Sequence, residues 1–268
     1  MSTALINSEW IQSAVAGAKE ASAAIIEIYN EGFEVDIKAD RSPVTIADKT
    51  SSKILSKHLS KTGILIMSEE EEMASYADRK KQDYVWIVDP LDGTKEFIAK
   101  NGEFCICIAL VKNGKAIFGL IAAPIGQTML LGGQDMGAYY FNYEVTDFLN
   151  QTYKVPPLTI NAKKTVAHSR YHGSVRAQLI ISSITEKYGA PDFIKKGSAL
   201  KFIDLTLGKA DFYPRLAPTM EWDIAAGQAI YESVGGEVLD FTNFEPLAYN
   251  KENLYNPYFI AKNKELNI

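Results

Sequence analysis

The chain contains few of the residues that mark disulfide-bonded, membrane-spanning or nucleic-acid-binding proteins. Only two of its 268 residues are cysteine and three are histidine, so neither a disulfide framework nor a Cys/His zinc site is indicated. No run reaches the ~18 apolar residues of a membrane span, and no basic region precedes an apolar run at the N-terminus. With a net charge of −5 and no long basic run, the composition argues against a nucleic acid polymer as partner.

The two cysteines, Cys105 and Cys107, alternate with apolar residues and so fall on the same face of an expected strand. Neighbours at this spacing on one strand rarely form a disulfide. We therefore expect two small buried hydrophobic side chains in a reducing compartment, and with the missing signal peptide this predicts a cytoplasmic protein.

The chain contains enough apolar residues to form a large hydrophobic core. Hydrophobic residues make up 47% of the chain and charged residues 23%, which argues against disorder. Helical spacing of apolar residues predicts helices over 8–30 and 45–59, and a half-buried strand is expected at 33–37. Residues 73–83 are polar and are expected to form a surface loop.

The two halves of the chain show different patterns. In the first half the expected strands are 64–67, 85–88, 104–111, 116–122, 127–131 and 137–142, with a hairpin turn at 112–115. From about residue 155, expected strands alternate with expected helices. The strands are 165–167, 193–194, 210–213, 237–240 and 258–261, and the helices are 174–187, 198–208 and 221–234. We expect an α+β subdomain over 1–150 and an α/β subdomain over 151–268, packed closely together.

The most informative motif is Val85-Trp86-Ile87-Val88 followed by Asp89-Pro90-Leu91-Asp92-Gly93-Thr94. The first part predicts a strand buried on both faces, and the second a turn at its carboxyl end, where open α/β sheets bind ligands. Two carboxylates three residues apart can converge on hard cations, while Gly93 and Thr94 offer N–H groups and a hydroxyl to an anion. This predicts a metal-dependent phosphate site.

Three other acidic positions are weak signals when taken singly. Glu69 opens a run of four glutamates, which is usually a solvated face. Asp223 lies at the opening of an expected helix, where an aspartate is most often a cap, and Asp48 is by default the cap partner of Thr45. Carboxylates and carbonyls suit Mg²⁺, and two such ions roughly 4 Å apart can hold the attacking and leaving oxygens of a phosphoryl displacement.

The order and spacing of four blocks resemble the signatures of the inositol monophosphatase superfamily, over residues 38–240. The blocks are Ser42-Pro43-Val44-Thr45-Ile46-Ala47-Asp48, Ser68-Glu69-Glu70, Asp89-Pro90-Leu91-Asp92-Gly93-Thr94 and Trp222-Asp223-Ile224-Ala225-Ala226-Gly227. The resemblance implies a layered αβαβα sandwich and a Mg²⁺-dependent, lithium-sensitive phosphomonoesterase.

Finer features resemble the bacterial 3′(2′),5′-bisphosphate nucleotidases of sulfate assimilation. They are Lys95-Glu96-Phe97, Asn101-Gly102-Glu103-Phe104, Gly197-Ser198-Ala199-Leu200-Lys201-Phe202, Ala210-Asp211-Phe212-Tyr213-Pro214-Arg215 and Pro218-Thr219-Met220-Glu221. Inositol monophosphatases typically carry Thr-Asn-Phe where this chain has Lys95-Glu96-Phe97. Ala217, where a glycine is common, departs from the pattern and affects backbone freedom rather than chemistry. The implied substrates are 3′-phosphoadenosine 5′-phosphate and its sulfated precursor, 3′-phosphoadenylyl sulfate.

The resemblance also implies roles, with two or three Mg²⁺ ions as cofactor. Glu69, Asp89 and the Leu91 carbonyl would hold one ion, and Asp89, Asp92 and Asp223 a second. Gly93 and Thr94 N–H groups would bind the scissile phosphate. The Thr94 hydroxyl, hydrogen-bonded to Asp48, would orient the attacking water, and Glu70 would lie just outside the metal ligands. The metal ligands and the Gly93-Thr94 pair would together form the substrate-binding surface.

The second phosphate of such a substrate needs a cation away from the metal ions. Lys201 and Arg215 are candidates, with Ser198 as a hydroxyl donor; a solvated helix lysine and a loop arginine are the ordinary alternatives. His168, Ser169 and Arg170 are further candidates, although a polar residue at a strand end is the slightly favoured explanation of His168. Lys38 is expected either to contact phosphate or to pair with nearby carboxylates.

Two other functions stay open at this point. The same fold could serve an inositol or other sugar monophosphatase, or a non-catalytic nucleotide- or cation-binding regulator. A kinase is disfavoured because no glycine-rich phosphate loop is present. The expected partner is a small-molecule bisphosphate nucleotide, with no integral membrane contact; relatives are soluble or loosely membrane-associated. The chain is expected to be a monomer or a homodimer.

Overall fold

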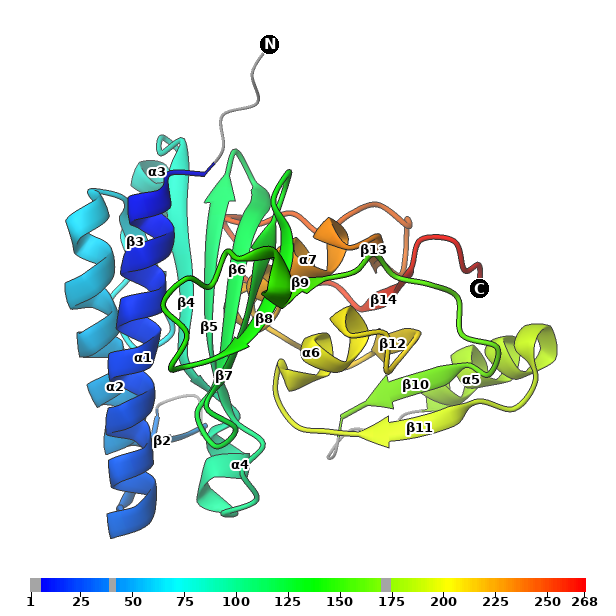
Figure 1. The fold of residues 1–268 in the computed structure, drawn as a ribbon, viewed down its shortest axis with the longest axis horizontal. Coiled ribbons are helices and arrows are strands. Elements are labelled where there is room, and N and C mark those ends of the chain that lie inside the picture. Colours follow the sequence, from blue (N-terminus) through cyan, green and yellow to red (C-terminus); the bar gives the residue numbers. More distant parts are fainter. Residues whose placement is uncertain (1–5, 39–41, 170–174) are drawn as a thin grey trace.

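The computed structural model describes residues 6–38, 42–169 and 175–268. Helices and sheets alternate in five layers (Figure 1): α1 (Ser8–Glu31) with α2 (Ile46–Leu59), a seven-stranded sheet, α6 (Leu200–Thr206) with α7 (Glu221–Ser233), a five-stranded sheet, and α5 (Val175–Tyr188). This confirms the predicted αβαβα sandwich. Among the described residues, no helix has the length and apolar character that crossing a membrane requires.

The first sheet has the order β3-β4-β5-β6-β7-β8-β9. Its strands are β3 (Leu65–Ser68), β4 (Tyr84–Asp92), β5 (Cys105–Lys112), β6 (Lys115–Ala123), β7 (Thr128–Gly133), β8 (Gly137–Asn142) and β9 (Lys154–Val155). Only β3 and β4 among these pairs run parallel. The β5–β6 hairpin turns at Asn113 and Gly114, which both have positive φ, as such a tight turn requires.

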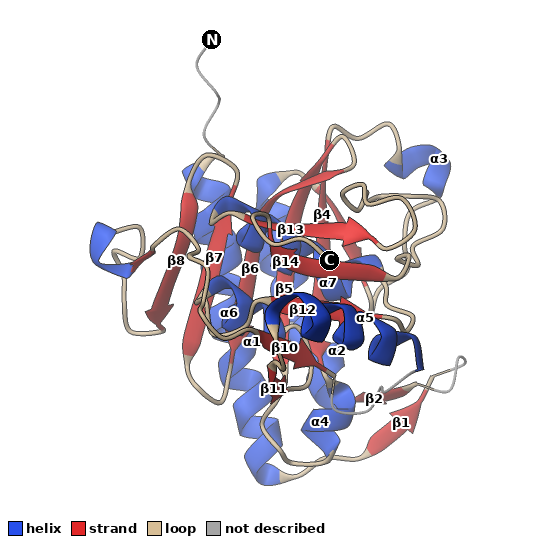
Figure 2. Cartoon of the chain, turned by 90° about the vertical axis from the view of Figure 1, so that its right-hand side faces the viewer, coloured by secondary structure: helices blue, strands red, loops and turns tan. Residues whose placement is uncertain are grey.

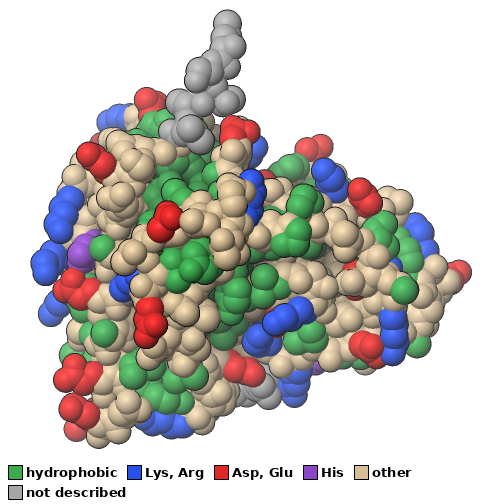
Figure 3. Space-filling view, in the orientation of Figure 1, with side chains coloured by type: hydrophobic (Ala, Val, Ile, Leu, Met, Phe, Trp, Pro, Cys, Tyr) green, Lys and Arg blue, Asp and Glu red, His purple; other side chains and the backbone are tan. Residues whose placement is uncertain are grey.

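The second sheet has the order β11-β10-β12-β14-β13. Its strands are β10 (Thr165–His168), β11 (Asp192–Lys195), β12 (Phe212–Arg215), β13 (Gly236–Asp240) and β14 (Phe259–Asn263). β10, β11 and β12 are parallel, and β14 runs antiparallel to β12 and β13. On the face shown in Figure 3, Lys and Arg side chains are interspersed with Asp and Glu rather than gathered into one surface.

The central helix α7 lies unusually close to the first sheet. A Cβ added to Gly119 on β6 would come within 2.0 Å of the Ala226 carbonyl oxygen of α7. A Cβ on Gly227 would come within 2.2 Å of the Phe202 ring of α6. Glycine at these two positions therefore allows the close approach that fixes α7, and with it the start of that helix, against the sheet.

Short elements gather at one end of the molecule. α4 (Thr94–Ile98), β1 (Val35–Ile37) and β2 (Pro43–Thr45) lie together there in both views (Figures 1 and 2). The remaining short elements are α3 (Tyr76–Arg79) and the 3₁₀ turns Ser60–Thr62 and Gln151–Tyr153.

Three local predictions were wrong. β1 is exposed at all three residues rather than half-buried, because it pairs only with β2. The expected loop at 73–83 contains α3, whose Arg79 is buried against distant parts of the chain. Strand β12 begins two residues after the start of the predicted 210–213, because the Ala210 N–H donates to the Asp204 carbonyl of α6 and the Asp211 N–H donates to the Thr165 carbonyl.

Candidate active site

Asp89 and Asp92 lie on the same side of β4 because the strand is irregular between them. Asp89 is paired with Cys107 and Asp92 with Cys105, so three steps on β4 match two on β5. Such a bulge lets side chains at an odd spacing share one face of a strand. The strand thus continues through the motif to Asp92, and the expected turn begins only at Gly93.

Asp223 joins these two carboxylates from the start of α7. Asp89, Asp92 and Asp223 each offer a carboxylate oxygen, and these oxygens lie within 4.8 Å of one another. The Met220 N–H donates to Asp223 Oδ2 at 2.9 Å, so Asp223 also caps its helix. We call these three residues the aspartate group. It contains three of the four carboxylates predicted as metal ligands.

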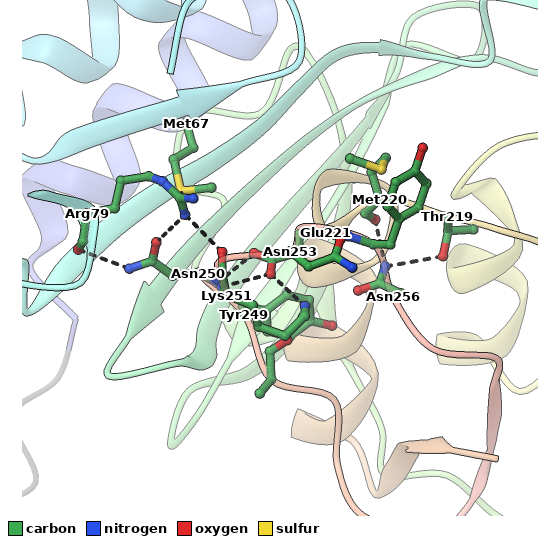
Figure 4. Close-up of polar contacts among 12 residues, drawn as sticks. Met67, Arg79, Thr219, Met220, Glu221, Tyr249, Asn250, Lys251, Asn253 and Asn256 are labelled. Carbon is green, nitrogen blue, oxygen red and sulfur yellow. Dashed lines mark hydrogen bonds and ion pairs between the residues drawn. The ribbon is translucent and has the colours of Figure 1, made fainter. Parts of the chain in front are cut away.

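The start of α7 is held by a buried polar network (Figure 4). Glu221 is 0% exposed and accepts hydrogen bonds from the Lys251 N–H at 3.0 Å and from Lys251 Nζ at 2.6 Å. Asn256 donates to the Met220 carbonyl at 2.7 Å. These contacts fix the backbone on both sides of residue 220 and so orient Asp223.

Arg79 of α3 connects this network, which lies in the C-terminal half of the chain, to the N-terminal half. It donates to Asn250 Oδ1 at 2.9 Å and to the Lys251 carbonyl at 3.2 Å. Sequence reasoning missed Arg79 altogether and noted Glu221 only as part of a motif. No local pattern marks Arg79, since its partners lie 171 and 172 residues away.

The aspartate group concentrates negative charge where contact with solvent is limited, because Asp89 is buried and Asp92 and Asp223 are half-buried. Burial, followed by repulsion from Glu69, Asp92 and Asp223, raises the pKa of Asp89 well above its usual range. Burial raises the pKa of Asp92 to about 6, although Lys201 and the Ala199 N–H oppose the shift. Burial and Asp92 raise the pKa of Asp223 to about 8. Closely spaced carboxylate oxygens are the donor set of a hard divalent cation, so the residues present fit Mg²⁺.

The stability of the metal-free protein should fall as pH rises. An aspartate whose folded pKa exceeds the unfolded value of about 3.9 favours folding below that value, and this contribution is lost as pH rises through the folded pKa. For Asp92 and Asp223 the loss spans about pH 4 to 8. Because Mg²⁺ binding replaces protons, we expect it to raise the melting temperature more at about pH 8 than at about pH 5. Thermal unfolding with Mg²⁺ and with a chelator measures this, and an equal increase at both pH values would contradict it.

Asp48 caps the start of α2 and also accepts a hydrogen bond from Thr94. Its Oδ2 accepts hydrogen bonds from the Thr45 N–H at 2.8 Å and from the Thr45 hydroxyl at 2.7 Å, which closes the start of α2. Its Oδ1 accepts a hydrogen bond from the Thr94 hydroxyl at 3.0 Å. The Thr94 hydroxyl, two residues after Asp92 in the chain, thereby has a fixed orientation, and its oxygen is able to accept a hydrogen bond from water.

Lys38 pairs with carboxylates, one of the two predicted possibilities. Its Nζ donates to Glu69 Oε1 at 2.8 Å and also contacts Glu70. Burial alone would lower the pKa of Lys38, but the Glu69 charge and the bonds to both glutamates outweigh it and raise the pKa. Burial raises the pKa of Glu70. Glu69 therefore pairs with Lys38 and is not grouped with the three aspartates, although its charge acts on Asp89.

A cavity of about 150 Å³ opens beside the aspartate group. Its lining residues are Asp92, Gly93, Lys95, Glu96, Ser169, Gly197, Ser198, Ala199, Lys201, Phe202, Tyr213, Arg215, Thr219, Asp223 and Ile224. The predicted contacts Ser198, Lys201 and Arg215 are all among them. Sequence reasoning missed Tyr213 and Thr219 as lining residues.

The two candidate cations differ in their surroundings. Lys201 is only 2% exposed, so the solvated-lysine alternative is wrong; its Nζ donates to the Lys196 and Ser198 carbonyls and lies 5.1 Å from the centre of the Tyr213 ring. Arg215 donates from Nη1 to the Ser169 hydroxyl, and its buried Nε has no hydrogen-bond partner among the described residues.

His168 ends β10 and packs against Phe193, and it is not among the residues that line the cavity. Ser169, by contrast, lines the cavity, and its hydroxyl accepts a hydrogen bond from Arg215 Nη1. Arg170 lies outside the described residues.

Comparisons with known proteins identify relatives over nearly the whole chain. The model of the inositol monophosphatase family matches residues 6–266. The 3′(2′),5′-bisphosphate nucleotidase CysQ of Shigella flexneri is 35% identical over 247 residues, covering 90% of this chain and 95% of that protein. CysQ of Escherichia coli strain K12 is 34% identical with the same coverage.

Solved structures agree with these matches. The crystal structure of CysQ from Bacteroides thetaiotaomicron, described as a bacterial member of the inositol monophosphatase family, superposes with a TM-score of 0.84. It is 39% identical, and the alignment covers 94% of this chain and 96% of that one. An inositol monophosphatase from Thermotoga maritima shares the fold, with a TM-score of 0.73 at 24% identity over 94% of this chain and 91% of that one.

Proposed function

The chain belongs to the inositol monophosphatase family, and we propose that it is a metal-dependent 3′(2′),5′-bisphosphate nucleotidase. It converts 3′-phosphoadenosine 5′-phosphate into AMP and phosphate, and acts on the sulfated precursor in the same way. Its relatives are named as phosphatases, so a non-catalytic regulator is not supported.

One observation carries the choice of a substrate with two phosphates. The cavity beside the aspartate group is lined by Asp92 and Asp223 and also by Lys201 and Arg215. A phosphate approaching the carboxylates needs metal ions, while a second phosphate needs a fixed cation of the protein. A guanidinium with its Nε unpartnered among the described residues suits that second phosphate.

The proposed roles of this chain's residues follow from their positions. Asp89, Asp92 and Asp223, with Glu69 and the Leu91 carbonyl, would hold two or three Mg²⁺ ions. Bound Mg²⁺ supplies charge stabilisation of the phosphoryl oxygens and makes hydroxide available near neutral pH. The N–H groups of Gly93, the N-cap of α4, and of Thr94, its first residue, have no partner within that helix and bind the scissile phosphate.

The Thr94 hydroxyl orients the water that attacks phosphorus in line with the departing ribose oxygen. Asp48 holds that hydroxyl and takes up its proton as the hydroxyl receives one from the water. Lys38 keeps Glu69 and Glu70 in place at the edge of the site. No covalent enzyme intermediate is required, because water reaches the phosphorus directly.

Phosphate release from 3′-phosphoadenosine 5′-phosphate tests this function directly. With Mg²⁺ present, the nucleotide product should be AMP, which keeps the 5′-phosphate, and a chelator should stop phosphate release. Adenosine 3′-phosphate as product, or release that continues without a divalent cation, would contradict the proposal.

Arg215→Gln should lower kcat/KM for a substrate with two phosphates much more than for a substrate with one phosphate. We expect kcat/KM for the bisphosphate nucleotide to fall roughly 30-fold, since the charge pair between Arg215 and the second phosphate is lost. For adenosine 3′-phosphate, kcat/KM should change little. Lys209→Gln is the matched control, because it removes the same charge from an exposed position outside the cavity lining. An equal loss on both substrates would mean that Arg215 does not recognise the second phosphate.

A further inference from the structure

Cys105 and Cys107 lie beside the aspartate group, and the proposed reaction uses neither of them. They occupy β5 opposite Asp92 and Asp89, are 0% and 1% exposed, and form no disulfide. Because they face the same side of the strand, their Sγ atoms lie 3.9 Å apart.

The two thiols form a compact donor set with two neighbouring oxygens. Cys105 Sγ lies 3.8 Å from Asp92 Oδ2 and 3.5 Å from Ser198 Oγ. A ligand atom of Asp92 and both sulfur atoms lie within 4.8 Å of one another. Asp92 therefore belongs to two groups of possible metal ligands, one made of oxygen alone and one made of sulfur and oxygen.

These distances match a tetrahedral site. With Zn–S bonds of about 2.3 Å, two sulfur ligands lie about 3.8 Å apart, and a sulfur and an oxygen ligand about 3.5 Å apart. The Cys105–Cys107 and Cys105–Ser198 distances are within a tenth of an ångström of these values, and the Cys105–Asp92 distance exceeds them by a few tenths. The ligand atoms of Cys105, Cys107 and Asp92, all within 4.8 Å of one another, are thus close enough to be considered as ligands of one cation.

A cation can also reach these donors. Asp92 and Ser198 line the cavity, so the oxygen side of the sulfur-containing group faces the space that substrate enters. Mg²⁺ prefers oxygen ligands, whereas thiolates select softer ions such as Zn²⁺. Asp92 thus joins the cavity to the two sulfur atoms, which lie behind it and are not part of the cavity lining.

We propose that Cys105, Cys107 and Asp92 bind a thiophilic divalent cation of the Zn²⁺ class, and that this inhibits the enzyme by withdrawing Asp92 from the Mg²⁺ ligands. Each thiol releases one proton to solvent as its metal–sulfur bond forms, and no oxidant or reductant takes part. Since Asp92 is shared, Zn²⁺ and Mg²⁺ compete.

Titration with Cd²⁺, a spectroscopic substitute for Zn²⁺, tests binding without any substrate. The chain has only two cysteines, so ultraviolet charge-transfer absorption of cadmium–thiolate bonds reports this pair alone. We expect the absorption to saturate at one Cd²⁺ per chain and to be lost in Cys107→Ala. No thiolate absorption in the folded wild type, or unchanged absorption in Cys107→Ala, would overturn the proposal. Cys107→Val fills the same buried space and serves if the alanine variant does not fold.

Inhibition by Zn²⁺ at fixed Mg²⁺ tests the consequence. The Zn²⁺ concentration that halves the rate should rise at least ~10-fold in Cys107→Ala, and added Mg²⁺ should restore the wild-type rate. If Zn²⁺ acts only at the oxygen ligands, both proteins will respond alike, which contradicts the proposal. A generic aryl phosphate is the substrate, so the outcome does not depend on nucleotide specificity.

Discussion

Replacing Asp89 by Asn is expected to abolish phosphatase activity and at the same time to stabilise the metal-free protein. Asp89 is buried, and its pKa is raised by that burial and by the charges of Glu69, Asp92 and Asp223. Asparagine keeps the acceptor oxygen that receives the Leu91 N–H at 3.0 Å, so the local backbone should persist. Removing the charge relieves repulsion in the fold but removes a central metal ligand.

The expected loss in kcat/KM is at least ~10³, about 4 kcal/mol of transition-state stabilisation. Thermal unfolding without metal should show a higher melting temperature than wild type at neutral pH, and Mg²⁺ should raise it less. Asp135→Asn is the control, because Asp135 is exposed in a turn at positive φ, which asparagine tolerates. Wild-type turnover by Asp89→Asn would show that the aspartate group is not the metal site.

Replacing Thr94 by Val is expected to lower kcat by roughly 10² to 10³, with KM nearly unchanged. Valine keeps the branched shape but removes the hydroxyl that donates to Asp48 Oδ1. The attacking water then loses its orienting partner, while the N–H groups proposed to bind phosphate remain. The loss therefore falls on the chemical step rather than on substrate binding.

Thr94→Ser provides the comparison for this prediction, since serine restores the hydroxyl without the methyl group. Steady-state kinetics should place Thr94→Ser within about 10-fold of wild type and well above Thr94→Val. If both variants lose activity equally, the hydroxyl is not what matters at position 94. If neither loses activity, the proposed positioning of water by Thr94 and Asp48 is wrong.

Local patterns in the sequence were sufficient for most of the secondary structure. The helical spacing of α1, the Thr45–Asp48 cap of α2 and the Asn113-Gly114 hairpin all act within a few residues, and each lies where predicted. The bulge between Asp89 and Asp92 was not predicted, because it arises from register against β5. Likewise, alternation predicted that β1 is half-buried, but all three of its residues are exposed, and β2 is its one strand partner among the described residues.

The site shows the same division between local and distant effects. The aspartates were found because motif order reveals them, and the structure brings Asp89, Asp92 and Asp223 together. The pairing of Lys38 with Glu69 and the anchoring of Glu221 by Lys251 join residues about thirty positions apart, with no pattern in between. The burial of Lys201 also follows from packing between layers, so its helix alone could not show that it faces the cavity.

The most direct test compares kcat/KM for 3′-phosphoadenosine 5′-phosphate and for inositol 1-phosphate, at one Mg²⁺ concentration and with the same preparation. The cavity with Lys201 and Arg215 predicts a preference of at least ~100-fold for the nucleotide, because a polar site left unfilled by the smaller substrate is costly. Equal or faster turnover of inositol 1-phosphate would contradict the account and identify the protein as a sugar-type monophosphatase on the same fold.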